Sequence, residues 1–267
     1  MRRAVKDGGT AVVVVPRSGA VEFLRERLGQ RRGRAALVHL AWPNLRGVQS
    51  TASASGAAAE GWGEYVQWSV ALREACSEGG AWFIGIGTGI EACAEDPAVN
   101  LAEPYRSYAR RKTELMKVLE RPSQTSWVRL HYIFGPYEDP SRLVPSAIRA
   151  CLKGVEFACG ARHRRRHWLY VEDVAALIAD FAAAPVTGIW DIAGRQELSF
   201  DELLGLVERA VERPLRLAEA ETNTADSRLA VVAPTNLASI VPATAGCPEN
   251  LLARLKDYAH WIEARGQ

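Results

Sequence analysis

The chain has 267 residues, of which 48% are hydrophobic and 24% are charged, and its formal net charge is +2. This composition is typical of a soluble globular protein with one large domain, or one domain with a smaller lobe. The charge is too small to indicate a nucleic-acid partner, and no apolar run is long enough to span a membrane. The five scattered cysteines favour reduced thiols in the cytoplasm over a disulfide framework or a metal site.

The first third of the chain reads as alternating strands and helices. Residues 10–15 are rich in valine and predict a buried strand, and residues 20–28 carry apolar side chains at helical spacing up to Gly29. Residues 35–41 predict a second strand. Small and polar residues over 50–61 indicate a loop.

Residues 62–76 predict a long helix whose large side chains fall on one stripe: Tyr65, Trp68, Leu72 and Cys76. Such a stripe packs either within one subunit or against a second copy. The spacing does not distinguish the two.

A strand followed by a helix carries the residues with the clearest chemistry. Residues 81–88 are apolar and end in Thr88, which has a glycine on each side. The segment 105–120 lacks Gly and Pro and predicts a helix on which Tyr108 and Lys112 leave the same face. A lysine ammonium favours the phenolate form of a nearby tyrosine, which can then act as a general base or acid near neutral pH. The structural alternative is a surface tyrosine and a solvated lysine.

The second half of the chain continues the alternation. Predicted strands cover 127–134, the segment leading into Tyr170, and 188–192, and predicted helices cover 146–152, 171–184 and 251–264. A further helix begins at Ser199, where Glu202 three residues later completes a capping box.

The order of these features resembles the extended short-chain dehydrogenase/reductase family of sugar-nucleotide epimerases, dehydratases and reductases. The resemblance covers about residues 36–212. It implies an α/β fold with a Rossmann-like doubly wound parallel sheet, shortened at the N-terminus, and a small C-terminal substrate lobe. Residues 1–135 are then the Rossmann-like core, and residues 136–267 form mixed core and substrate-binding lobe within one globular unit.

The resemblance also implies roles for individual residues. Thr88 orients the substrate oxygen, Tyr108 is the acid/base, and Lys112 is its electrostatic partner. The positions expected to contact a cofactor are Ala41, Tyr108, Lys112 and Phe134. In dehydratase relatives an Asp-Glu pair follows the threonine directly, whereas here Gly89 follows, which argues against 4,6-dehydration.

Two arginines are expected to bind the diphosphate of a nucleoside-diphosphate sugar, because a guanidinium can hold a phosphate with two parallel hydrogen bonds. Arg166 aligns best with the family position, and Arg142 is the weaker candidate. Arg164 and Arg165 are expected in a solvated loop. Glu91 is expected to cap or hydrogen-bond locally rather than act as a base.

The glycine-rich turn of a dinucleotide site is missing. After the first predicted strand only Gly19 is present of the three expected glycines, and Glu22 brings a carboxylate to the place of a phosphate. In an alternative alignment His39 to Trp42 matches the family's fourth strand, and the first β-α-β unit is absent. Both alignments predict that NAD(P) binds weakly or not at all.

Two functions follow from these patterns. One is an epimerase or ketoreductase of nucleoside-diphosphate sugars, which without NAD(P) would be a cofactor-free isomerase that enolises a keto sugar. The other is a non-catalytic relative that serves as a binding or partner subunit. By analogy with the family, a homodimer would form through the helices at 62–76 and 105–120.

Overall fold

The computed structural model describes residues 6–7, 10–11, 18–30, 33–40, 61–93, 105–120, 123–160, 162–218, 234, 236, 238 and 240–266. The chain folds into two compact units. Unit 1 consists of residues 1–86, 114–127 and 182–188, and unit 2 of residues 87–113, 128–181 and 189–267.

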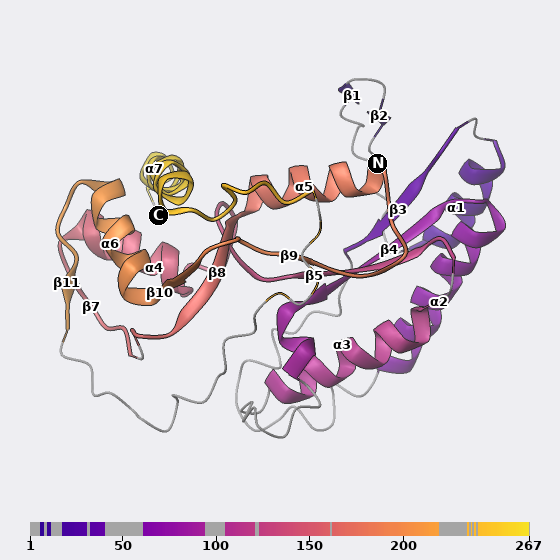
Figure 1. Ribbon diagram of the computed structural model, residues 1–267, viewed down its shortest axis with the longest axis horizontal. Helices are drawn as coiled ribbons and strands as arrows, with labels where there is room; N and C mark the ends of the chain where they lie inside the picture. Colours follow the sequence, from indigo (N-terminus) through magenta and orange to yellow (C-terminus); the bar gives the residue numbers. More distant parts are fainter. Residues whose placement is uncertain are drawn as a thin grey trace. The chain divides into compact units, whose positions relative to one another are not determined.

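A parallel sheet confirms the predicted α/β fold class. Its strand order is β3-β4-β5-β9, with β3 at Ala36–His39, β4 at Trp82–Thr88, β5 at Thr125–Leu130 and β9 at Gly188–Ile192. Strands β3 and β4 pair in parallel, from Ala36 opposite Trp82 to His39 opposite Gly85 (Figure 1). Parallel pairing requires a crossover between the two strands, which the helix between them provides.

Two helices of unit 1 pack side by side. They are α1 at Ala20–Gly29 and α2 at Trp62–Glu78 (Figure 1). The close approach depends on Gly79, because a Cβ atom there would lie 2.5 Å from Cβ of Leu28.

The predicted stripe of α2 packs within the chain. Tyr65, Leu72 and Cys76 are all at most 3% exposed. The ring of His39 on β3 lies against this stripe, and its Nε2 is 3.0 Å from Oγ of Ser69. The stripe therefore supplies core packing. A homodimer through this helix and the helix at 105–120 stays a prediction.

Unit 2 contains a second sheet of three strands in the order β10-β8-β6. Strands β6 (Tyr132–Phe134) and β8 (Arg165–Tyr170) pair in parallel, and β10 (Glu197–Ser199) pairs antiparallel with β8. The other elements of the unit include a 3₁₀ helix η2 (Gly89–Cys93), a short parallel pair β7 (Glu156–Phe157) and β11 (Arg216–Leu217), and most of helix α5 (Val171–Ala183).

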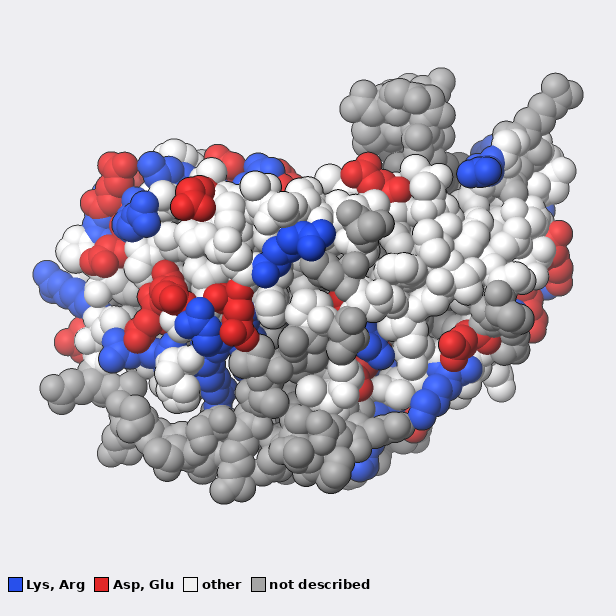
Figure 2. All heavy atoms as spheres, viewed as in Figure 1, with Lys and Arg blue, Asp and Glu red and all other residues white. Residues whose placement is uncertain are grey.

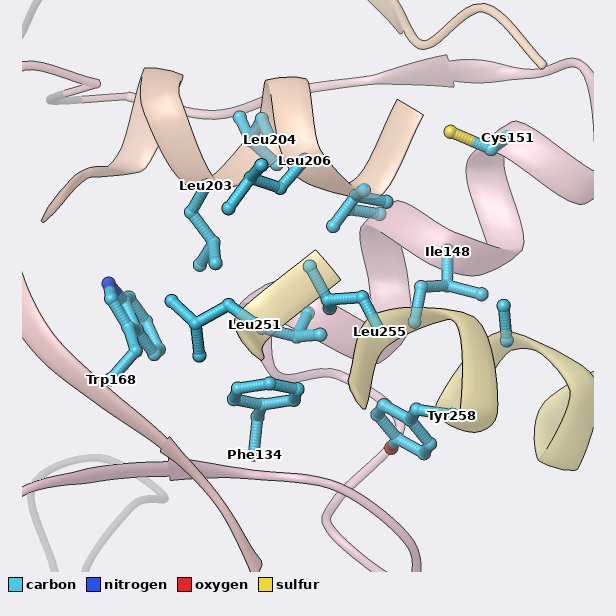
Figure 3. Close-up of a cluster of buried hydrophobic side chains, with 14 of the residues drawn as sticks. Phe134, Ile148, Cys151, Trp168, Leu203, Leu204, Leu206, Leu251, Leu255 and Tyr258 are labelled. Atoms are coloured by element: carbon cyan, nitrogen blue, oxygen red, sulfur yellow. The ribbon is translucent and has the colours of Figure 1, made fainter. Parts of the chain in front are cut away.

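Three helices build the hydrophobic core of unit 2. They are α4 at Leu143–Lys153, α6 at Phe200–Val211 and α7 at Pro248–Ala264. Figure 3 shows their side chains meeting those of β6 and β8 in one cluster, with residues that include Phe134, Ile148, Trp168, Leu203, Leu251 and Tyr258. Each of these side chains is at most 5% exposed.

The predicted capping box of α6 is confirmed. Oγ of Ser199 accepts the Glu202 backbone N–H at 3.0 Å, and the Glu202 carboxylate accepts the Ser199 N–H at 2.6 Å.

Helix α4 begins at Leu143, three residues before the predicted start, and α7 begins at Pro248. Proline suits the first turn of a helix because its missing N–H has no partner there. Residues 12–15 of the first predicted strand lie outside the described residues, and β1 (Lys6–Asp7) pairs antiparallel with β2 (Thr10–Ala11).

The single strand predicted over 127–134 is wrong. The segment forms two strands, β5 and β6, which belong to different sheets and separate at His131. The backbone N–H of His131 donates to the carbonyl of Ile192 at 3.2 Å, and the strand on the other side of the break pairs with β8.

Charges are interspersed on the surface of the described residues. Figure 2 shows Lys and Arg beside Asp and Glu on the face that it draws. Among the described helices, none combines the length and the apolar character needed to cross a bilayer.

Candidate functional site

Strand β4 delivers Thr88 at its end, as the sequence predicts. Its preceding residues are mostly buried, with Phe83 and Ile84 at most 1% exposed, so the strand is fixed by its own core packing. At Gly89 the chain turns into η2. The backbone N–H of Thr88 donates to Oε1 of Glu91 at 2.7 Å. The expectation that Glu91 hydrogen-bonds locally is thereby confirmed.

Helix α3 (Tyr105–Leu119) carries Tyr108 and Lys112 one turn apart. Lys112 is only 5% exposed, and Tyr108 is half-buried. Burial lowers the pKa of the Lys112 amine from 10.5 to about 8, although the nearby Glu91 carboxylate acts in the opposite direction. At neutral pH the lysine is therefore still mainly an ammonium ion, as its predicted role requires. Thr88, Tyr108 and Lys112 all belong to unit 2.

Two buried pairs of polar side chains flank the turn after Thr88. Nε of Arg129 on β5 lies 3.5 Å from Oε2 of Glu91, whose side chain is fully buried. Nε2 of His131 lies 2.8 Å from Oδ1 of Asp191 on β9, and both side chains are 2% exposed. The second carboxylate oxygen of Asp191 accepts the backbone N–H of Asn236 at 2.9 Å.

These pairs were not predicted from the sequence, although a signal was present. Arg129 and His131 interrupt an otherwise apolar segment, and Asp191 stands alone in an apolar strand. A charged residue inside an apolar strand requires a partner, because burying a lone charge is very costly. The sequence thus indicates that partners exist but does not indicate which ones.

The imidazole of His131 contacts the turn directly. A Cβ atom at Gly89 would lie 2.7 Å from Nδ1 and 2.8 Å from Cε1 of His131. Because only a glycine leaves room for the ring, the residue after Thr88 is fixed in type by tertiary packing. The carboxylate of Asp191 holds that ring in place from the opposite nitrogen.

Arg166 is a buried cation. It lies on β8, is 3% exposed, and stacks between the rings of Tyr132 and Phe200 at 5.0 and 5.8 Å. Nη1 donates to the carbonyl of Arg165 at 2.6 Å, while the buried Nε has no hydrogen-bond partner among the described residues. No carboxylate within the described part of the chain pairs with it.

The neighbouring Arg165 corrects one expectation. It lies on β8 rather than in a solvated loop, and its guanidinium pairs with Glu197 at 3.3 Å and with Glu202 at 3.1 Å. Arg142, the weaker diphosphate candidate, is exposed at the N-terminus of α4. The two arginines on β8 thus differ: Arg165 has carboxylate partners, and Arg166 has none that the structure describes.

The described residues offer little of a dinucleotide site. The N-cap of α1 is Gly19, with φ of +72°, and the first turn of that helix carries the exposed Glu22. A carboxylate at a helix N-terminus occupies the position where a pyrophosphate would bind, and it repels the negative charge of that group. Phe134 is 1% exposed and its ring packs in the core, so a cofactor could meet only the end of its strand. Ala41 lies outside the described residues. The described residues at the N-terminus of α1 therefore do not fit the pyrophosphate of NAD(P).

A cavity of about 350 Å³ lies in unit 1 and contains none of the predicted site residues. Its lining includes Arg73, Ser77, Phe83 and Thr125. Arg73 pairs with Glu74 at 3.3 Å, so its charge is already compensated. In the described ranges no group of three or more metal-ligating side chains is present.

Known structures share this fold. A UDP-N-acetylglucosamine 4-epimerase from Methanobrevibacter ruminantium, in complex with UDP-N-acetylmuramic acid, matches with a TM-score of 0.68 and 18% identity, covering 91% of this chain and 80% of that chain. The UDP-glucose 4-epimerase of Thermus thermophilus in complex with NAD matches with a TM-score of 0.60 and 19% identity, covering 90% and 82%. RMD from Pseudomonas aeruginosa, complexed with NADPH, matches with a TM-score of 0.60 and 17% identity, covering 86% and 82%. At such identities the likeness concerns the fold.

No protein with a curated description matches the chain. The model of the NAD dependent epimerase/dehydratase family, in contrast, matches residues 35–193, which are more than half of the sequence. This range contains β3 to β5 with Thr88, Tyr108 and Lys112, and extends through β8 to β9. The chain belongs to the NAD-dependent epimerase/dehydratase family.

Proposed function

We propose that this protein isomerises a nucleoside-diphosphate keto sugar, with Tyr108 as the acid/base, Lys112 as its electrostatic partner and Thr88 orienting the reacting oxygen. The observation that carries the proposal is the burial of the Lys112 ammonium one turn from Tyr108 on α3. A buried charge is costly unless it is compensated, and groups with perturbed pKa values cluster at functional sites.

The proposed chemistry is a proton transfer. The Tyr108 phenolate takes a proton from the carbon beside the substrate ketone, and the electrons of that C–H bond form an enolate. Thr88 donates a hydrogen bond to the enolate oxygen. The Tyr108 phenol then gives its proton to the former carbonyl carbon, while the hydroxyl proton of the deprotonated carbon passes to the former ketone oxygen. This moves the carbonyl group to the adjacent carbon and restores the Tyr108 phenolate. No hydride donor or acceptor enters this balance, in keeping with the poor fit of the described residues to NAD(P).

The environment of Arg166 supports the proposal that the substrate carries a diphosphate. Its guanidinium is buried without a described carboxylate partner, and its Nε lacks a hydrogen-bond acceptor among the described residues. A phosphate oxygen would satisfy both needs at once, because a charged hydrogen bond to a guanidinium is about twice as strong as a neutral one. Arg142 is the second candidate contact. Two structures of similar fold are complexes with UDP-N-acetylmuramic acid and with UDP-glucose, which belong to the same chemical class of ligand.

The catalytic role is tested by Tyr108→Phe. The change removes one hydroxyl and keeps the ring, and loss of a general acid/base typically lowers the rate by about 10²–10⁴-fold. Tyr105→Phe is the matched control, since Tyr105 lies on the same helix but is 48% exposed. Exchange of the substrate's α-proton for deuterium, followed by NMR with a keto-sugar nucleotide, measures the step directly. Equal exchange in both variants would rule out Tyr108 as the proton carrier. An inactive wild type that still binds the nucleotide would instead favour a non-catalytic binding subunit.

The substrate contact is tested by Arg166→Met, which keeps an apolar stem between the two rings and removes the charge. Loss of a charged hydrogen bond should weaken binding of UDP by about 1.5–3 kcal/mol in calorimetry. The same change should stabilise the free protein, because an uncompensated buried charge is removed. A purely structural arginine would give destabilisation instead. Arg162→Ala is the control, because Arg162 pairs with Asp201 and 46% of its side chain is exposed.

A further inference from the structure

Glu91 is a carboxylate that the structure buries completely. Its side chain is 0% exposed, and it stands on η2, three residues after Thr88. One oxygen accepts the backbone N–H of Thr88 at 2.7 Å. This hydrogen bond resembles the carboxylate half of a capping box and fixes the backbone at the point where β4 ends.

The second oxygen faces a cation. Nε of Arg129 lies 3.5 Å from Oε2 of Glu91, and only 13% of the arginine side chain is exposed. One oxygen thus accepts a backbone amide hydrogen and the other faces a guanidinium, and both of these partners interact more strongly with an ionised carboxylate than with a protonated one.

The same carboxylate acts on Lys112. Burial lowers the pKa of this lysine, and Glu91 is the charged group that counteracts the effect. Other titratable or charged groups that the structure describes around the turn include Arg129 on β5, His131 against Gly89 with its partner Asp191, and Tyr108 on the lysine's own helix. Glu91 thus contacts the end of the strand and also acts, through its charge, on the lysine of the proposed acid/base pair.

We propose that Glu91 is a positioning residue of the site: it fixes the backbone at Thr88 and provides the negative charge that compensates the Lys112 ammonium. This role deepens the proposed function and rests on it for its catalytic meaning. One residue would then both position the strand end that carries the Thr88 hydroxyl and compensate the positive charge of Lys112. A residue that only capped η2 would affect the first and leave the second unchanged.

Two variants separate the two effects. Glu91→Gln keeps an oxygen that can accept the Thr88 N–H but removes the charge, and Glu91→Ala removes both. Without a nearby opposite charge an amine loses its proton more readily, and such a partner is typically worth about one to three pKa units. We therefore expect Lys112 to react with acetic anhydride at neutral pH about tenfold faster in both variants, as measured by competitive labelling and mass spectrometry. We expect hydrogen exchange at the Thr88 amide to accelerate only in Glu91→Ala.

Glu202→Gln is the matched control. Its carboxylate accepts the backbone N–H of a residue three positions earlier, as that of Glu91 does, but at the start of α6. It should lower the melting temperature slightly and leave the labelling of Lys112 unchanged. Unchanged labelling of Lys112 in Glu91→Gln would overturn the electrostatic part of the proposal, and unchanged exchange at Thr88 in Glu91→Ala would overturn the structural part.

These measurements need no substrate. A protein that shows both effects but no turnover would contradict the proposed function and leave the role of Glu91 intact. Turnover of a keto sugar by the wild type, together with unchanged labelling of Lys112 in Glu91→Gln, would support the proposed function and contradict the electrostatic role of Glu91. If Glu91→Ala does not fold, Glu91→Gln still decides the electrostatic part, because glutamine matches glutamate in size and shape.

Discussion

Single residues of this protein carry buried charge that the solvent does not compensate. Lys112 and Arg166 are both at most 5% exposed, yet they differ in how the structure treats them. The charge of Lys112 is opposed by Glu91, while Arg166 lies between aromatic rings with no described carboxylate beside it. Lysine can release its proton when buried, whereas arginine cannot, so only Lys112 changes its charge in the accessible pH range.

The buried lysine predicts a pH-dependent stability. Its pKa is about 8 in the folded protein and 10.5 in the unfolded chain, so between these values the unfolded chain binds more protons. Stability therefore rises with pH in this window. We expect the free energy of unfolding of the wild type, minus that of Lys112→Met, to increase by about 3 kcal/mol at most from pH 8 to pH 10.5, at about 1.4 kcal/mol per pKa unit. Urea unfolding at several pH values measures this difference. A flat difference would show that Lys112 is not desolvated.

The turn at Gly89 gives a second prediction for one residue. Gly89→Ala would bring a Cβ atom to 2.7 Å from the ring of His131, and Asp191 keeps that ring from moving away. Overpacking of this kind costs about 1–3 kcal/mol. Gly205→Ala, within α6 and with no atom within 4 Å of the new Cβ, is the control and should be neutral or slightly stabilising. Thermal unfolding of both variants tests the contact, and equal melting temperatures would contradict it.

Helices and strands of this protein are positioned by contacts with residues that lie elsewhere in the chain. Helix α1 meets α2 where the latter ends, at a glycine that admits Leu28. The segment 125–134 shows the same dependence, because its two halves join different sheets. Apolar periodicity describes which face of an element is buried, but the partner of that face is chosen by the rest of the chain.

The contact between α1 and α2 can be tested by Gly79→Ala. Its Cβ would meet Cβ of Leu28 at 2.5 Å, an atom too close to the backbone to move aside cheaply. We expect a loss of about 1–3 kcal/mol in the free energy of unfolding. The control is Gly63→Ala near the start of α2, where no atom lies within 4 Å of the added methyl. There the higher helix propensity of alanine should stabilise the protein by up to about 1 kcal/mol. A control that loses as much as Gly79→Ala would remove the steric explanation.

For the molecule as a whole, the main question is whether a family member whose described residues include a carboxylate at the N-terminus of α1 binds a dinucleotide. We expect NAD⁺, NADH, NADP⁺ and NADPH to bind weakly or not at all, because Glu22 brings negative charge to the N-terminus of α1. The eight tryptophans make protein fluorescence a suitable probe. Glu22→Gln should strengthen any residual binding, while Glu26→Gln, one turn further along, should not. Micromolar binding by the wild type would overturn this prediction and restore a hydride-transfer mechanism.

The sequence by itself determined the local features: the capping box at Ser199, the strand that ends in Thr88, and the placement of Tyr108 and Lys112 on one face of a helix. Each depends on spacing along the chain, which fixes geometry over a few residues. Only the tertiary structure decided that Glu91 meets Arg129 and that His131 meets Asp191, 60 residues away. Such pairs follow from which strands lie side by side. A buried charge in the sequence announces that it needs a partner, but only the packing of the whole chain determines which residue that partner is.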